Sequence, residues 1–407
     1  MDYITYAVPF FLLALLVELA YGIAIKKNTY RLNDAIGNLF MGTLRTANKL
    51  IIIGAAGYVF YLAETKFALW RLDAESPITW VFAFIIYDFF YYWFHRISHE
   101  RQIFWASHVA HHQSEDYNLS TALRQTGTGA FVSWVFYIPM FLIGIPSYVF
   151  ISVASLNLIY QFWVHSEHIP KLGWYENYFV TASNHRVHHA QNDQYIDKNY
   201  GGVFIIWDRM FGTHKIEDEN EPCIYGIRGT LNTFNPVWAN LHIYVKIIKE
   251  MFLSRKWKDK LYAPFARTGW IPKSFPAQVN KDEFNPQAFR KYDPEIKKEY
   301  KLYALFQYLF ITYIFLAFIQ SDYLNYFELW ITITMMTFTM YCTSMCLDGK
   351  NGLKAEVVRL TLCLIIASYA YVEASLSLIA VSVFIYSLAN LLFIIYLNRP
   401  QEIFSSN

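Results

Sequence analysis

Residues 78–100 read ITWVFAFIIYDFFYYWFHRISHE, an apolar run that ends in two histidines. A helix needs about 20 mostly apolar residues to cross the hydrocarbon core of a bilayer, and this run is close to that length. His95 and His99 have the spacing HxxxH, which places both side chains on one face of a helix. The stretch therefore predicts a membrane-spanning helix that carries two candidate metal ligands at its polar end.

The composition of the 407-residue chain agrees with a membrane protein. Apolar residues make up 55% of the chain and charged residues only 16%, whereas soluble proteins contain about 25% charged residues. The net charge of +2 gives no indication of a nucleic-acid partner. The four cysteines lack the spacing of a metal site, and the first apolar segment has no features of a cleaved signal peptide.

Nine segments are candidate spans, and the expected fold is an all-α integral membrane protein with about nine transmembrane helices. The segments are residues 5–25, 41–63, 78–95, 129–145, 147–165, 302–320, 324–345, 356–373 and 376–397. Arg45 and Lys49 in the second segment and Asp88 in the third indicate that these two helices partly line protein rather than lipid.

Basic residues beside the first span predict the orientation in the membrane. Lys26, Lys27 and Arg31 follow that span, and basic residues are retained preferentially on the cytoplasmic side. Counting spans from there puts the polar stretch 166–300 in the cytoplasm as a histidine-rich helical cap. We therefore expect a multi-pass protein with two parts, a region of residues 1–300 that contains every histidine and a four-span region of residues 301–407.

Ten of the twelve histidines lie between residues 95 and 189, mostly in three clusters. The clusters are His95 and His99, then His108, His111 and His112, then His185, His188 and His189. Each HxxHH or HxxxH cluster can present two or three imidazoles to one point, and His165 adds a ninth candidate. Nine donors are too many for one tetrahedral zinc site, so we expect two metal ions. We interpret His168, His214 and His242 as core or interfacial residues.

These clusters, with residues 197–201 (DKNYG) and 207–213 (WDRMFGT), resemble the sterol desaturase and fatty acid hydroxylase superfamily of membrane di-iron enzymes. The resemblance covers about residues 80–215. Within the superfamily, residues 99–100 (HE), 114–125 (SEDYNLSTALRQ) and 160–165 (YQFWVH) are similar to the alkylglycerol monooxygenase branch.

The resemblance implies a di-iron centre and a lipid substrate. Its two iron ions would be held by His95, His99, His108, His111, His112, His165, His185, His188 and His189, with no catalytic residue beyond this centre. The reaction would use O₂ and tetrahydrobiopterin to hydroxylate the ether-bearing carbon of an alkylglycerol, releasing a fatty aldehyde and a glycerol derivative. One departure concerns the second iron, because many fatty acid hydroxylases have a histidine where this chain has Gln161.

Carboxylates beside the clusters are further candidates. Glu100 adjoins His99 and is the candidate for binding the pterin ring, whose guanidine-like edge offers paired donors to a carboxylate. Side chains that could orient a ligand imidazole are Asp116, Asp193, Asp197 and Asp208. Asp88 lies seven residues before His95 on the same helix face, so it could either sit under the metal site or make a structural hydrogen bond.

Two other functions are compatible with the sequence. A fatty acid, sterol or carotenoid hydroxylase or desaturase of the same superfamily would take electrons from a reductase chain instead of a pterin. A zinc-binding membrane protein without oxygenase activity would also use imidazole ligands, because ligand type alone does not distinguish iron from zinc, copper or nickel.

Overall fold

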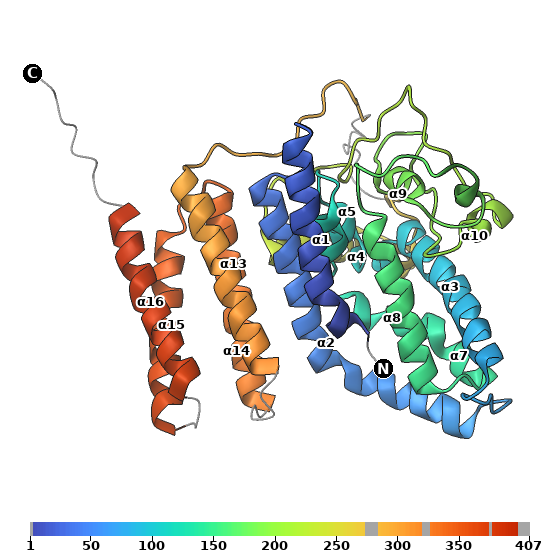
Figure 1. The fold of residues 1–407 in the computed structure, drawn as a ribbon, viewed down its shortest axis with the longest axis horizontal. Coiled ribbons are helices and arrows are strands. Elements are labelled where there is room, and N and C mark those ends of the chain that lie inside the picture. The colour runs from blue at the N-terminus through green and yellow to red at the C-terminus, as the bar shows by residue number, and fades with distance from the viewer. Residues whose placement is uncertain (1–2, 273–283, 320–325, 374–376, 398–407) are drawn as a thin grey trace, which may run out of the picture. The chain divides into compact units, whose positions relative to one another are not determined.

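A computed structural model describes residues 3–272, 284–319, 326–373 and 377–397. The chain forms two compact units, Met1–Thr233 with Val237–Asp293, and Phe234–Pro236 with Pro294–Asn407. We refer to them as the histidine-bearing unit and the C-terminal unit. The described residues of both contain helices and no strand, as predicted (Figure 1).

Six helices are long and apolar enough to cross a membrane among the described residues, and the protein is an integral membrane protein. They are α1 (Ile4–Ala24), α3 (Pro77–Glu100), α13 (Lys298–Ile319), α14 (Tyr326–Leu347), α15 (Leu353–Glu373) and α16 (Ser377–Leu397). The predicted boundaries at residues 320, 324 and 376 lie outside the described residues.

The other three predicted spans are not among these six. Helix α2 (Leu32–Lys66) runs without a break through the predicted span 41–63, in which the side chains of residues 48–55 lie outside the described part of the chain. Helix α8 (Ser147–Trp163) has 17 residues, so it is about 25 Å long, shorter than a hydrocarbon core of about 30 Å. The prediction of nine spans is therefore not confirmed.

Segment 129–145 is broken rather than a single helix. It consists of η1 (Gly129–Phe131), η2 (Ser133–Tyr137) and α7 (Ile138–Ile143). Pro139 lies in the first turn of α7 and has no N–H to continue a helix from η2. Gly144 then ends α7 at φ +98°, and a Cβ at this position would lie 2.0 Å from the Trp70 carbonyl oxygen.

The other helices of the histidine-bearing unit, except α11, have at most eight residues each. They are α4 (Gln102–Ala106), α5 (Val109–His112), α6 (Leu119–Leu123), η3 (Gly173–Asn177), α9 (Ala182–His189), α10 (Ile206–Met210), α11 (Pro236–Leu253), α12 (Trp257–Tyr262) and η4 (Ala263–Phe265).

The C-terminal unit contains a buried charged pair between Arg359 and Glu356. The Arg359 guanidinium also donates to the hydroxyl of Tyr386 at 2.9 Å and to Gln307 Oε1 at 3.3 Å. Tyr303 donates to Glu356 Oε1 at 3.0 Å. These contacts satisfy charges that would be unfavourable in hydrocarbon, and they join α13, α15 and α16.

Candidate metal centre

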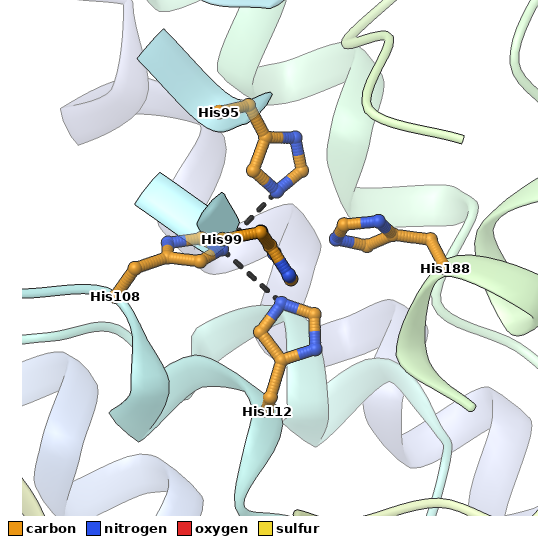
Figure 2. A group of neighbouring side chains, drawn as sticks. All are labelled: His95, His99, His108, His112 and His188. Atoms are coloured by element: carbon orange, nitrogen blue, oxygen red, sulfur yellow. Dashed lines mark hydrogen bonds between the residues drawn. The ribbon is translucent and has the colours of Figure 1, made fainter. Parts of the chain in front are cut away.

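The nine predicted ligands lie in two buried groups. The first group comprises His95, His99, His108, His112 and His188, and the second comprises His111, His165, His185 and His189. In each group one ring nitrogen per histidine lies within 4.8 Å of all the others. Every one of the nine side chains is at most 9% exposed. Figure 2 shows the five side chains of the first group converging on a common point.

Each HxxHH cluster is divided between the two groups. His108 and His112, four residues apart, belong to the first group, whereas His111 points to the second. In α9 the division is reversed, because His188 belongs to the first group and its neighbours to the second. The rings of His112 and His189, one from each group, stack with centroids 4.3 Å apart. The two groups are therefore adjacent halves of one centre.

The spacing of the ring nitrogens suits a metal ion. His108 Nε2 lies 3.1 Å from His95 Nε2 and 3.1 Å from His112 Nε2 (Figure 2). Nitrogens bound to one ion at about 2.1 Å lie roughly 3–4 Å apart. His99 Nε2 and His188 Nε2 are buried without a hydrogen-bond partner in the part of the chain that the structure describes, which is unfavourable unless an ion binds them. The residues present therefore fit a metal ion in the first group.

The ring nitrogens of the second group, which has four histidines, are spaced like those of the first. His185 Nε2 lies 3.1 Å from His165 Nε2 and 3.2 Å from His189 Nε2. Gln161 does not join this group, because its side-chain nitrogen donates to Asn157 Oδ1 at 2.6 Å and its side-chain oxygen accepts from the Tyr91 hydroxyl at 2.7 Å. The second group thus offers one nitrogen donor fewer than the first.

Main-chain carbonyls orient four of the histidines through Nδ1. The pairs are His95 with Tyr200 at 2.8 Å, His111 with Arg124 at 2.8 Å, His165 with Gln161 at 2.8 Å and His188 with Lys198 at 3.0 Å. A carbonyl oxygen only accepts hydrogen bonds, so Nδ1 carries the proton and Nε2 is the deprotonated nitrogen. This tautomer directs the Nε2 lone pair toward the group.

Two aspartates hold the segment that supplies two of these carbonyls. Asp208 accepts hydrogen bonds from the Tyr200 and Gly201 amides at 2.7 and 2.8 Å. Asp88, which is fully buried in α3, accepts from the Val203 amide and from Asn157, at 2.8 and 2.7 Å. Asp208 therefore positions the His95 partner, whereas Asp88 ties the segment to α3 and α8.

The predicted residues outside the two groups have other contacts. Glu100 accepts a hydrogen bond from Arg96 Nε at 2.8 Å, and its side chain is 28% exposed. The His168 ring packs edge-on against Tyr21, and His214 and His242 also lie outside both groups. Three aspartates are not bonded to a ligand histidine: Asp116 pairs with Arg31 and Lys291, Asp193 pairs with Arg228, and Asp197 is exposed.

Two residues beside the site were not assigned roles from the sequence. The Tyr117 ring lies 5.7 Å from the His165 ring and 5.4 Å from the His189 ring, and its hydroxyl donates to the Val164 carbonyl. The buried Arg124 guanidinium donates to the Ala110 carbonyl at 2.6 Å, within the second histidine cluster. The spacing of residues along the sequence does not predict either contact, because both side chains reach the site only through the tertiary fold.

Burial keeps the histidines neutral. It lowers the pKa of His111 to about 4, and it lowers the pKa values of His108, His112, His185, His188 and His189 well below 6.5. A metal ion binds the neutral imidazole, so these side chains need not lose a proton at neutral pH.

Comparisons with known proteins agree with this centre. The fatty acid hydroxylase family model matches residues 80–213. The chain is 43% identical over 274 residues to alkylglycerol monooxygenase from Homo sapiens, covering 67% of this chain and 60% of that protein. It is 35% identical over 328 residues to alkylglycerol monooxygenase from Xenopus tropicalis, covering 79% of this chain and 71% of that protein.

A more distant relative is ornithine lipid hydroxylase from Rhizobium tropici, 29% identical over 185 residues, which cover 42% of this chain and 55% of the relative. No solved structure matches. The aligned part spans less than two thirds of the human relative. The identity and coverage with the Xenopus protein show that the chain belongs to the alkylglycerol monooxygenase family.

Proposed function

We propose that this protein is a di-iron monooxygenase that hydroxylates the ether-bearing carbon of 1-O-alkylglycerols. The observation that carries the proposal is the pair of adjacent, buried, all-histidine groups, which offer five and four nitrogen donors. Imidazole ligands also suit zinc, copper and nickel. We infer iron because oxygen insertion into an unactivated C–H bond requires a redox-active ion.

The nine histidines are the proposed iron ligands. When bound, the two iron ions would supply the redox chemistry that activates O₂. The protein contributes ligand geometry, because main-chain carbonyls fix the tautomers of four histidines. It also contributes enclosure, because the buried groups keep bulk water from the reacting C–H bond.

The electron balance of the reaction requires a reductant. One oxygen atom of O₂ enters the C–H bond and the other leaves as water, which consumes two electrons and two protons. The resulting hemiacetal breaks its C–O bond to give a fatty aldehyde and a glycerol. We propose tetrahydrobiopterin as the two-electron donor, from the family resemblance.

Glu100 is the proposed pterin contact. It follows His99 at the end of α3, and a partly exposed carboxylate there can accept paired N–H donors. The ring of the half-buried Trp105 lies 5.1 Å from the His99 ring, so it offers an aromatic face close to the first group. We further propose that this end of α3 faces the cytoplasm, because Lys26, Lys27 and Arg31 follow α1.

The test is oxidation of a long-chain 1-O-alkylglycerol by purified, iron-reconstituted protein, with and without tetrahydrobiopterin, following fatty aldehyde. We expect aldehyde only with the pterin. Turnover with a ferredoxin or b-type cytochrome alone would favour the reductase-dependent branch of the superfamily. Tightly bound zinc without O₂ consumption would contradict an oxygenase function.

A further inference from the structure

One face of α11 carries large apolar side chains to the surface of the histidine-bearing unit. Leu241, Val245, Ile248 and Phe252 are all exposed, Ile248 at 50% and Phe252 at 78%. Their spacing of four, three and four residues aligns them in a stripe along the helix. Trp257, which is 76% exposed, continues the apolar surface at the start of α12. We call these five residues the α11–α12 apolar face.

The opposite side of α11 packs against the rest of the histidine-bearing unit. Ile247 and Glu250 are buried, and Glu250 accepts a hydrogen bond from Gln102 Nε2 at 3.2 Å. Gln113, which follows His112, donates to the Ala239 carbonyl at 3.0 Å. These contacts fix the rotation of α11, so the apolar stripe faces away from the histidines.

Basic residues border the apolar face. Between residues 246 and 260, six of the eight charged residues are basic: Lys246, Lys249, Arg255, Lys256, Lys258 and Lys260. One of the two acidic residues, Glu250, is buried, so the surface of this segment is positively charged. Apolar side chains beside clustered Lys and Arg are the features of a helix that lies on an anionic bilayer surface.

Main-chain contacts place this region at the end of a membrane span. The Gln102 amide donates to the Ala266 carbonyl at 3.0 Å, and the Thr268 amide donates to the Glu100 carbonyl at 3.2 Å. Residues 266–268 are therefore held against the last turn of α3, at the end of a helix that is long and apolar enough to cross a membrane. Helix α12 ends four residues before Ala266, and so it lies close to the same end of α3.

We propose that α11 and α12 lie in the plane of the membrane, with the α11–α12 apolar face at the boundary of headgroups and acyl chains. The flanking Lys and Arg side chains bind anionic lipid headgroups. This interface is independent of the reaction assigned to the metal centre, and its test does not measure activity.

The experiment measures the depth of single nitroxide labels on the full chain in lipid nanodiscs. Labels are attached through p-acetylphenylalanine, which leaves the native cysteines untouched, at Val245, Ile248 or Phe252. The matched control is Lys246, which lies on another side of α11 with a side chain that is 48% exposed. Power saturation compares accessibility to O₂, which concentrates in the bilayer, with accessibility to a water-soluble nickel chelate.

We expect a several-fold higher ratio of O₂ to nickel accessibility at the three apolar positions than at position 246. Labels that are all open to nickel would show a surface in water and overturn the proposal. Labels shielded from both reagents would also overturn it, because they would show that protein covers this face.

The headgroup part of the proposal has its own comparison. With the label at Ile248, nanodiscs of phosphatidylcholine are compared with nanodiscs that also contain phosphatidylserine. We expect deeper insertion with phosphatidylserine, and loss of this difference when Lys249, Arg255, Lys256 and Lys258 are replaced by Gln. Equal depth in both lipids before the replacement would refute headgroup binding by these side chains.

Discussion

His99 tests the first histidine group directly, because its Nε2 is buried and has no hydrogen-bond partner among the described residues. We expect His99→Ala to bind fewer than two iron ions per chain and to lose aldehyde formation. His214→Ala, at a half-buried position outside both groups, should keep both properties. Iron per chain is measured by mass spectrometry after reconstitution, and two ions in His99→Ala would remove His99 from the proposed ligands.

Asp208 acts on the metal centre through the main chain of Tyr200. Replacing Asp208 with Ala removes the acceptor for the Tyr200 and Gly201 amides, so the carbonyl that orients His95 loses its support. Loss of such a partner typically weakens metal affinity about 10–100-fold, and we expect this range for the first group. Asp193→Ala is the control, because the Asp193 side chain is 79% exposed and, among the residues that the structure describes, forms a salt bridge only with Arg228. Metal titration that gives equal affinities for the two variants would contradict the role of Asp208.

The break in segment 129–145 makes a prediction about α7. An alanine Cβ at Gly144 would meet the Trp70 carbonyl at 2.0 Å, and its backbone has φ +98°. We expect Gly144→Ala to reduce the free energy of unfolding by at least about 3 kcal/mol. Gly173 also has a positive φ, at +62°, but no atom lies within 4 Å of its added Cβ. Gly173→Ala should therefore reduce the free energy of unfolding by only about 1–2 kcal/mol. Thermal unfolding of both variants measures the two losses. Equal losses would show that the contact between the Cβ at position 144 and the Trp70 carbonyl is relieved.

The C-terminal helices depend on the Arg359–Glu356 pair. Arg359→Met leaves Glu356 as a buried, uncompensated charge, and breaking such a pair typically reduces stability by about 3–5 kcal/mol. Lys354→Met, at an exposed position of the same helix, should have little effect. A thiol-reactive dye during heating reports on this unit, because three of the four cysteines lie there and Cys342 is fully buried. Unchanged thiol exposure in Arg359→Met would show that the pair is dispensable.

The buried histidines together make the stability of the metal-free protein depend on pH. In the folded chain the pKa of His111 is about 4 instead of 6.5, and the lowered values of its neighbours act in the same direction. Below pH 6.5 the unfolded chain therefore binds more protons than the folded chain. The stability present above pH 6.5 is lost progressively as the pH falls toward 4.

Unfolding temperatures of the chelator-treated protein between pH 8 and pH 5 measure this dependence. We expect a fall as the pH decreases through this range, and a higher unfolding temperature for the iron-loaded protein at each pH, because ligand binding to the folded state stabilises it. A flat profile for the metal-free protein would indicate that the imidazoles are solvated.

Sequence spacing was a good guide to which histidines gather, since the structure brings all nine together. Spacing does not predict their division into two groups, because on a regular helix residues three and four apart share one face. His108 and His112 do converge, but α5 is a single short turn, and His111 points to the other group. The main-chain carbonyls that accept hydrogen bonds from the histidines could not be predicted from the sequence either. Every residue has a carbonyl, and only the tertiary fold brings those of Tyr200 and Lys198 to His95 and His188.

Hydropathy predicted the helical membrane fold, whereas the predicted number of nine spans is not confirmed. A window over residues 129–145 averages across Pro139 and Gly144, and so it does not register that the helix is interrupted before Pro139 and ends at Gly144. The C-terminal spans were predictable because their helices are continuous and apolar over about the thickness of a bilayer. Residues 147–165 are predicted as a span and do form helix α8, but α8 has 17 residues, fewer than the roughly 20 that cross the hydrocarbon core.

The use of main-chain carbonyls as histidine partners has an evolutionary consequence. The hydrogen bond from His188 to residue 198 does not depend on the lysine side chain there, so this position is free to drift among relatives without loss of the contact. Chain length is constrained instead, since one inserted residue between 189 and 198 would displace that carbonyl by up to about 3.8 Å. We expect a deep mutational scan to tolerate most substitutions at position 198 and to reject single insertions and deletions in the segment before it.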